Sequence, residues 1–244
     1  MKNNAYSALA PHYEKLITSC DYEQWSQYVY NKVKQYSPSL NGCDLACGSG
    51  YFTRCLKKAG FNVYGVDQSQ EMLFQAQANS LKEKVPVEYQ QQDIKKFKSF
   101  NKLGFITVIN DGLNYLSKVE LKKALKSFYN SLEKGGALIF DLSSEYKLKN
   151  VIGNNLFCED GQDVTYVWFN TLLEDSVKME LTFFTKDGDK YVRTDETHVQ
   201  YIHKTKDVID DLNSVGFEIV ETVGHLGEEL CNESLRINFV AIKK

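Results

Sequence analysis

The stretch CDLACGSGYF, residues 43–52, decides how this chain is expected to fold. Gly48 and Gly50 lie two positions apart after a short apolar segment that contains Asp44. A glycine loop between a first parallel strand and its helix lets a bound molecule approach the backbone. The third glycine of a dinucleotide loop, G-x-G-x-x-G, is replaced by Thr53, and a carboxylate ahead of the loop does little for a diphosphate. The stretch therefore favours a ligand that brings positive charge or N–H donors.

Outward from this loop, short apolar runs alternate with helical patterns. A capping box, Ser117 to Glu120, marks the start of one of these helices. Strands are expected at about 42–46, 61–66, 85–90, 105–109 and 137–140, and helices at about 51–59, 69–80 and from 118 to a glycine pair at 135–136. Five β–α units of this kind predict a parallel sheet with helices on both faces.

The flanking segments have different patterns. Residues 22–36 carry Trp25, Val29 and Val33 at helical spacing. After residue 160, the segments 164–173, 177–185 and 190–203 are long and strand-like, and a helix from 205 to 215 and two final strands follow. We therefore expect an N-terminal helical cap (1–40), a core (41–142 and 204–244) and an inserted antiparallel β subdomain (143–203).

The composition is that of an ordinary globular protein. The chain has 244 residues, of which 43% are hydrophobic and 25% charged, and this length suits one α/β domain with an insertion. The net charge is −3, and no Lys/Arg run reaches the density typical of nucleic-acid binding. A nucleic-acid partner is therefore disfavoured, although a basic patch formed in three dimensions stays open.

Cysteine usage and hydropathy bear on the compartment. Six cysteines are scattered without a C-x-x-C pair or zinc-ligand spacing, so we expect no metal and reduced thiols in the cytoplasm. Residues 1–16 lack the apolar centre of a signal peptide. No run approaches the roughly 18 apolar residues of a membrane span. These patterns predict a cytoplasmic protein without a membrane partner, and they leave its oligomeric state open.

Acidic residues lie in the first of three successive predicted strands and after the second and third. Asp67 lies 23 residues after Asp44, and Asp93 follows the third strand. An acid at the end of a second strand can accept both hydrogen bonds of a ribose diol, which suits a nicotinamide or an adenosyl cofactor alike. An acid after the third strand has no such role in a dinucleotide enzyme. The order of the three acids therefore disfavours a dinucleotide cofactor.

The order Asp44-x-Ala46-x-Gly48-x-Gly50 resembles the first motif of class I S-adenosylmethionine-dependent methyltransferases, D/E-x-G-x-G-x-G, with alanine at the first glycine. The segments VINDGLNYL (108–116) and LEKGGALIFDL (132–142) are similar to the family's fourth-strand and fifth-strand motifs. The segments 6–16 and 21–29 resemble the cap of its small-molecule members. The resemblance covers about residues 6–142, with a looser match near the C-terminus, and 143–203 carries no family motif.

The resemblance implies a Rossmann-like methyltransferase fold: a doubly wound seven-stranded sheet whose last strand runs antiparallel. It implies S-adenosyl-L-methionine as cofactor, with Asp67 on the ribose, Asp93 on the adenine amino group, and Met72 and Ile94 flanking the ring. It also places the end of the fourth strand beside the reacting methyl group. The residues expected to bind the cofactor are Tyr13, Trp25, Asp44, Ala46, Gly48, Gly50, Asp67, Gln68, Met72, Asp93, Ile94, Asn110 and Asp111.

The predicted activity is methyl transfer to a small-molecule O, N or C acceptor. Transfer from a sulfonium needs mainly alignment, so the sequence assigns no catalytic residue. Tyr115 and the histidines of the inserted strands, His198 and His203, are candidates without a fixed role. Three alternatives stay open. One is a non-catalytic S-adenosylmethionine-binding protein, and another is a nicotinamide-dependent oxidoreductase, which Thr53 and Asp93 disfavour. The third is an RNA or protein acceptor, and the net charge of −3 disfavours RNA.

Overall fold

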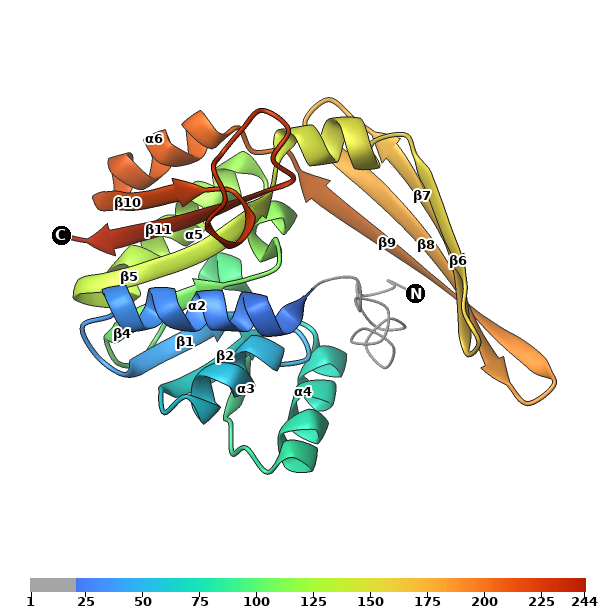
Figure 1. Cartoon of the computed structure of the whole chain (residues 1–244), viewed down its shortest axis with the longest axis horizontal. Coiled ribbons are helices and arrows are strands. Elements are labelled where there is room, and N and C mark those ends of the chain that lie inside the picture. The colour runs from blue at the N-terminus through green and yellow to red at the C-terminus, as the bar shows by residue number, and fades with distance from the viewer. Residues whose placement is uncertain (1–20) are drawn as a thin grey trace.

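The structure is a computed structural model, and it describes residues 21–244. Its main sheet has seven strands in the order β10-β11-β5-β4-β1-β2-β3 (Figure 1). β11 pairs antiparallel with both β5 and β10, whereas β5, β4, β1, β2 and β3 pair in parallel. The predicted doubly wound sheet with an antiparallel last strand is therefore confirmed. The strands are β1 (Asn41–Leu45), β2 (Asn62–Asp67), β3 (Tyr89–Gln91), β4 (Leu103–Val108), β5 (Leu132–Ser143), β10 (Phe217–Val223) and β11 (Arg236–Lys243).

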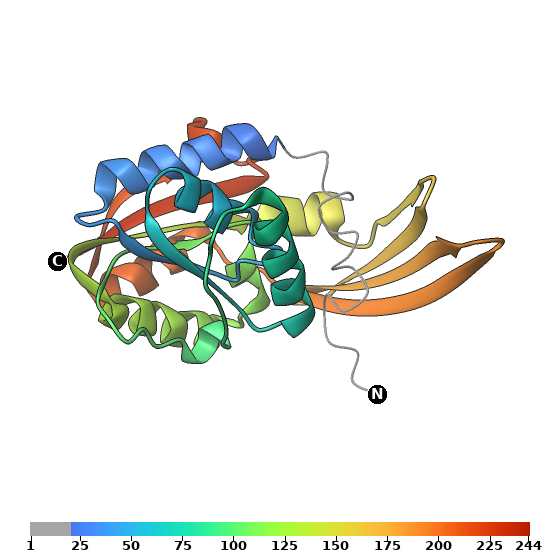
Figure 2. The same cartoon turned by 90° about the horizontal axis from the view of Figure 1, so that it is seen from below.

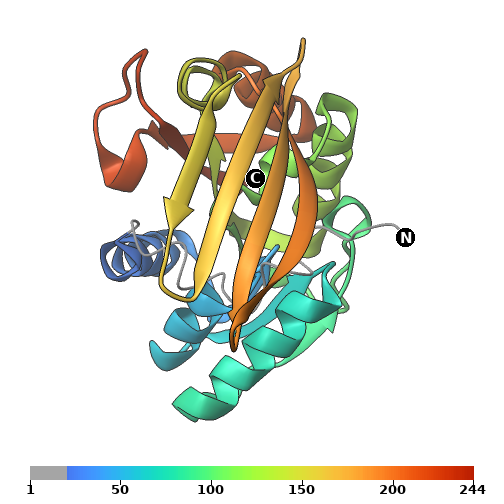
Figure 3. The same cartoon turned by 90° about the vertical axis from the view of Figure 1, so that its right-hand side faces the viewer.

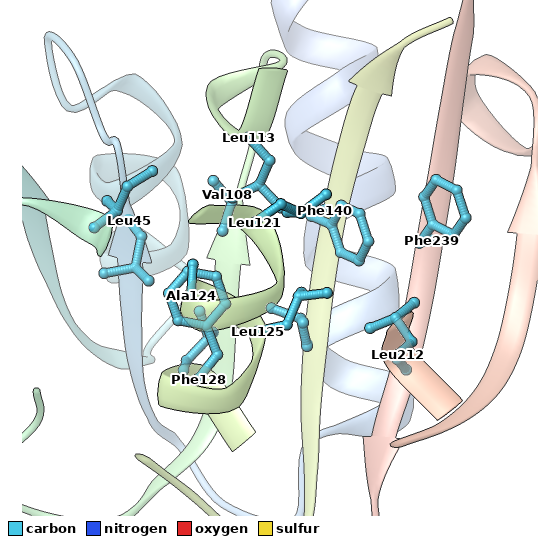
Figure 4. Close-up of a cluster of buried hydrophobic side chains, with 14 of the residues drawn as sticks. Leu45, Val108, Leu113, Leu121, Ala124, Leu125, Phe128, Phe140, Leu212 and Phe239 are labelled. Carbon is cyan, nitrogen blue, oxygen red and sulfur yellow. The ribbon is translucent and has the colours of Figure 1, made fainter. Parts of the chain in front are cut away.

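Helices cover both faces of this sheet, as Figure 2 shows for α2 and α5. They are α2 (Tyr22–Tyr36), α3 (Tyr51–Lys58), α4 (Gln70–Glu83), α5 (Lys118–Ser131) and α6 (Thr205–Val215). On one face, α5 and α6 bury Leu125, Phe128 and Leu212 against strand residues that include Phe140 and Phe239 (Figure 4). On the other face, α2 and α3 bury a second apolar cluster. Each helix therefore buries one apolar stripe, as the sequence spacing predicts.

The predicted capping box of α5 is present: the Ser117 side chain accepts from the Glu120 backbone, and the Glu120 side chain accepts from the Ser117 backbone. Two other element boundaries differ from the sequence-based expectation. The helix does not extend to the glycine pair at 135–136, because β5 begins at Leu132 and pairs there with β4. The third strand is also shorter than expected, three residues instead of six.

The insertion is a four-stranded antiparallel sheet in the order β6-β7-β8-β9 (Figure 3). Its strands are β6 (Leu156–Asp160), β7 (Val164–Leu172), β8 (Ser176–Asp187) and β9 (Lys190–Tyr201), and the π-helical segment η3 (Lys147–Ile152) precedes them. β6 was not predicted, because its largely exposed residues show no alternation of apolar and polar side chains. The sheet projects from the end of the molecule at which β5 finishes (Figures 1 and 2).

Hydrogen bonds tie the insertion to the short 3₁₀ segment η2 (Gly112–Tyr115) that follows β4. The buried Asn114 amide donates to the carbonyls of Ser143 and Tyr201, and its oxygen accepts from the Ser143 backbone. His203 Nε2 lies 3.0 Å from the carbonyl of Leu116. Both ends of the inserted segment are therefore fixed beside the loop that follows β4.

Candidate active site

The glycine loop between β1 and α3 follows a left-handed path. Ala46, Gly48 and Gly50 all have positive φ values, 52°, 54° and 78°. A Cβ atom on Gly50 would lie only 2.3 Å from the Tyr89 hydroxyl oxygen, so glycine is required there for space as well as for its backbone conformation. Ala46 adopts the left-handed conformation without being glycine, which costs about 1 kcal/mol or more.

Asp44 is buried at the end of β1 and is held by two threonines. Thr53 Oγ1 donates to Oδ2 at 2.5 Å, and Thr107 Oγ1 donates to Oδ1 at 2.8 Å. Burial raises the pKa of Asp44 to about 6, although the two hydroxyl bonds oppose the shift. Thr53, which replaces the third glycine of a dinucleotide loop, therefore has a positive role, because it orients the carboxylate beneath the loop.

Asp67 ends β2 and binds the glycine loop through its carboxylate. Oδ2 accepts from the Gly48 backbone N–H at 2.8 Å, and Oδ1 accepts from the Ser69 backbone N–H at 2.9 Å. Burial raises the pKa of Asp67, while these backbone donors oppose the shift. Each carboxylate oxygen keeps a further lone pair, so the group can still accept two hydroxyl donors from a ligand.

The third acid, Asp93, caps the short 3₁₀ turn η1 (Ile94–Lys96) after β3. Its side chain accepts from the Lys95 backbone at 3.0 Å, which fixes the carboxyl group at the entrance of the turn. Ile94 and, at the start of α4, Met72 are both buried. Together they supply apolar surface beside Asp93 that suits a flat ring.

A cavity of about 350 Å³ brings these residues together at the carboxyl ends of the parallel strands. The residues predicted to bind a cofactor that line it are Asp44, Ala46, Gly48, Asp67, Gln68, Met72, Asp93, Ile94 and Asn110. Its wall also includes Tyr22, Tyr51 and Tyr115. Open α/β sheets place ligands at this edge. Three carboxylates against one lysine, Lys95, make the wall unfavourable for a diphosphate.

Three predicted residues do not line this cavity, and Tyr13 lies outside the described residues. Gly50 caps α3 beside it. Trp25 is buried away from it, with the Arg236 guanidinium 4.6 Å from its ring centroid. Asp111 is directed instead toward a buried ionic network.

A larger groove, about 1030 Å³, lies at the opposite end of the strands, where Asn41 and Asn62 begin β1 and β2.

The ionic network joins Arg236 to two carboxylates. Arg236 donates to Asp111 at 2.9 Å and to Asp141, and the backbone N–H groups of Asn110 and Asp111 donate to Asp141. Gln200, from β9, donates to Asp111 at 2.6 Å. Burial raises the pKa of Asp141. Burial is also the largest single influence on Asp111, but the charges of Arg236 and Lys147 and the hydrogen bonds from Gln200 and Arg236 together outweigh it and lower the pKa. The network fixes the left-handed turn at Asn110 and Asp111 next to the cavity.

A second polar chain leads from the cavity into the inserted sheet. Tyr115 Oη lies 3.2 Å from His198 Nδ1, and His198 Nε2 lies 3.0 Å from Glu196 Oε2. Sequence reasoning named Tyr115 and His198 separately and missed Glu196. The available signal was the alternation of Glu196, His198 and Gln200 in β9, which places three polar side chains on one face of a strand.

Fold and cavity together define a class of protein, the Rossmann-like enzymes that bind an adenosyl cofactor without phosphate. Within residues 21–244, no group of three or more His, Cys, Asp or Glu side chains is arranged to hold a metal ion. None of the helices in that range is long and apolar enough to cross a bilayer.

Comparison with known proteins identifies the family. Residues 43–136 match a family described as a methyltransferase domain. A protein of Geobacillus sp. (strain WCH70) named as a methyltransferase is 34% identical over 98% of this chain and 99% of its own length. YqeM of Bacillus subtilis (strain 168), also named as a methyltransferase, is 30% identical over 98% of this chain and 97% of its own length.

The crystal structure of an S-adenosylmethionine-dependent methyltransferase from Clostridium acetobutylicum ATCC 824 is similar throughout. It is 34% identical, with a TM-score of 0.90 over 98% of this chain and 99% of that one. DesVI of Streptomyces venezuelae shares the fold at 19% identity, with a TM-score of 0.80 over 97% of this chain and 98% of that one. The chain belongs to the S-adenosylmethionine-dependent methyltransferases, and S-adenosylmethionine is its cofactor.

Proposed function

We propose that this methyltransferase acts on a small-molecule acceptor and that the 350 Å³ cavity holds its cofactor. The observation that carries the proposal is the convergence on one cavity of three acids from neighbouring strands: Asp44 near the end of β1, Asp67 at the end of β2 and Asp93 after β3. A sulfonium and an ammonium are both attracted to this acidic wall.

Each part of the cofactor has a matching group. Asp67 accepts the two ribose hydroxyls with the lone pairs that the Gly48 and Ser69 backbones leave open. Asp93 accepts from the adenine amino group, and Met72 and Ile94 pack on the two faces of the ring. Gln68 lies beside the ribose.

The methionine end lies over the glycine loop. Ala46 and Gly48 let the ligand approach the backbone, Asp44 attracts the ammonium through the field of its carboxylate, and Asn110 lies where the methyl group reacts. Gly50 and Asp111 do not line the cavity. Gly50 shapes the glycine loop at the start of α3, and Asp111 fixes the turn after β4 through its bond to Arg236. Bound S-adenosylmethionine supplies the activated methyl group, and the chain supplies alignment and a partly dry pocket.

The charge around the cavity supports a small acceptor. Three carboxylates at the cavity wall repel a phosphate-rich polymer, and the overall charge of −3 does the same at longer range. We also propose that the protein works in the cytoplasm, which the five free cysteines of the described part support.

Two measurements test this proposal. In a thermal-shift experiment, S-adenosylhomocysteine should raise the melting temperature and NAD should not. Incubation with methyl-tritiated S-adenosylmethionine and a low-molecular-weight cell extract should then move label into a small compound. Cofactor binding without transfer to any fraction would favour the non-catalytic alternative, and label confined to protein or RNA would contradict a small acceptor.

A further inference from the structure

The chain Tyr115–His198–Glu196 connects the cavity to the interior of the inserted sheet. Tyr115 lines the cavity, and its hydroxyl oxygen lies 3.2 Å from His198 Nδ1. The other ring nitrogen, Nε2, lies 3.0 Å from the Glu196 carboxylate. Hydroxyl, imidazole and carboxylate are therefore connected in one line that starts at the cavity wall.

The inner members of this chain are unusually buried for ionisable groups. Glu196 is 2% exposed and His198 is 5% exposed. Across the sheet, Glu196 pairs with Leu181 and His198 pairs with Met179, so apolar side chains flank both groups. Burying a carboxylate beside apolar neighbours costs several kcal/mol unless a partner compensates it. Sheet packing alone would be served by two apolar residues at these positions.

The position of Tyr115 is fixed from both sides. Asn114, its preceding residue, donates to the Tyr201 carbonyl at the end of β9. Leu116, its following residue, has its carbonyl 3.0 Å from His203 Nε2. Both anchors belong to the same end of the inserted sheet as His198. The backbone around Tyr115 is therefore held at a constant distance from His198, which is the preorganisation that proton transfer requires.

We propose that Tyr115, His198 and Glu196 form a proton-accepting chain for the methyl acceptor, an inference that rests on the proposed function. A lone pair of the acceptor forms the bond to the methyl carbon, the carbon–sulfur bond breaks, and its electron pair stays on sulfur in S-adenosylhomocysteine. The acceptor's proton passes to the Tyr115 oxygen as the tyrosine proton passes to His198 Nδ1. Glu196 accepts from His198 Nε2–H, which keeps Nδ1 available and stabilises the imidazolium.

This assignment defines the chemical class of the acceptor. It carries a hydroxyl or an amine nitrogen with a proton to lose, and a thioether or tertiary amine does not use the chain. Tyr115 is the catalytic residue, because it contacts the acceptor. His198 and Glu196 are positioning residues that act through Tyr115.

The test uses the full chain and the labelled low-molecular-weight acceptor fraction described above. Tyr115→Phe and Glu196→Gln keep the size of each side chain and remove the proton-transfer group or the charge. We expect kcat to fall about 100-fold for Tyr115→Phe and about 10-fold for Glu196→Gln, with KM unchanged. The affinity for S-adenosylhomocysteine, measured by calorimetry, should stay at the wild-type value. Tyr64→Phe, which removes a hydroxyl bonded to Ser99 in the distant groove, is the matched control and should leave kcat unchanged.

The outcomes separate this inference from the proposed function. Wild-type labelling with full activity in both variants would overturn the proton chain alone. A fall in kcat that is matched by a fall in S-adenosylhomocysteine affinity would also overturn it, because the residues would then shape the pocket only. Absence of labelling by the wild-type protein would overturn the proposed function, and the proton chain with it.

Discussion

The two sides of the cavity are built in different ways. On the side of the glycine loop, where we propose that the cofactor binds, Asp44 and Thr53 are nine residues apart, and Asp67 bonds to the loop 19 residues before it. On the side facing the insertion, Asp111 bonds to Gln200 over a separation of 89 residues and to Arg236 over 125. The glycine-loop side therefore depends on contacts within residues 44–107, the longest of which joins Thr107 to Asp44, whereas the other side also requires the C-terminal part of the chain.

This difference predicts that substitutions in the Asp111–Arg236 network lower the unfolding free energy, whereas substitutions beside the glycine loop weaken ligand binding. Arg236→Met should have the largest effect, about 3–5 kcal/mol of unfolding free energy, because it leaves the buried Asp141 carboxylate and the partly buried Asp111 carboxylate without their cation. Urea unfolding followed by circular dichroism measures the loss.

Arg193→Met is the matched control for that change. Arg193 pairs with Asp195 on the exposed surface of β9, and such pairs contribute about 0–1 kcal/mol. Equal destabilisation by the two substitutions would show that the Arg236 network does not stabilise the fold as described.

On the cofactor side, Asp67→Ala should weaken S-adenosylhomocysteine binding by about 1.5–3 kcal/mol, because two hydrogen bonds to a charged acceptor are lost. Isothermal titration calorimetry gives the affinity, and thermal melting shows whether the variant is folded. Unchanged affinity in a folded variant would place the ribose elsewhere.

Cofactor affinity should depend on pH through Asp44. The pKa of this group is raised to about 6 in the folded protein, so below pH 6 the carboxylate becomes neutral and attracts the ammonium less. At pH 5 about one-tenth remains ionised, so S-adenosylhomocysteine should bind about tenfold more weakly than at pH 7. Asp44→Asn should bind weakly at both pH values. A wild-type affinity that does not change between these pH values would remove Asp44 from ammonium recognition.

The same raised pKa has the opposite consequence for the free protein. The ionised form of Asp44 is less favourable in the folded protein than in the unfolded chain, whose carboxyl titrates near pH 4. The contribution of this group to stability is therefore lost as the pH rises from about 4 to about 6. Thermal melting of wild-type and Asp44→Asn proteins across this range, without ligand, measures that contribution.

The smallest expected effect is at Ala46. Replacement by glycine should raise the unfolding free energy by up to about 1 kcal/mol, because the left-handed strain disappears from the folded state. The greater freedom of glycine in the unfolded chain opposes this gain and offsets only part of it. Gly112→Ala is an informative counterpart, since its Cβ would lie 2.9 Å from the Ala46 Cβ and should destabilise the loop contact. Destabilisation by Ala46→Gly would contradict the account of strain in the loop.

How much the sequence could predict follows the same division. The succession of strands and helices along the chain, the capping box at Ser117 and the positions of the three acids were predictable because each depends on a few neighbouring residues, whereas the seven-stranded sheet was implied by the family resemblance. β6 was not, because its exposed residues lack alternation of apolar and polar side chains, and the partners of Asp111 were not, because they lie 89 and 125 residues away in the sequence. Trp25 was predicted at the cofactor, but aromatic residues at helical spacing do not reveal which buried partner they meet, here Arg236.

A crystal structure of the protein with bound S-adenosylhomocysteine would show directly whether the 350 Å³ cavity holds the cofactor. We expect adenine between Met72 and Ile94, with the ribose hydroxyls bonded to Asp67. Density for the ligand in the larger groove beside Asn41 and Asn62, or ribose hydroxyls without contact to Asp67, would contradict this expectation.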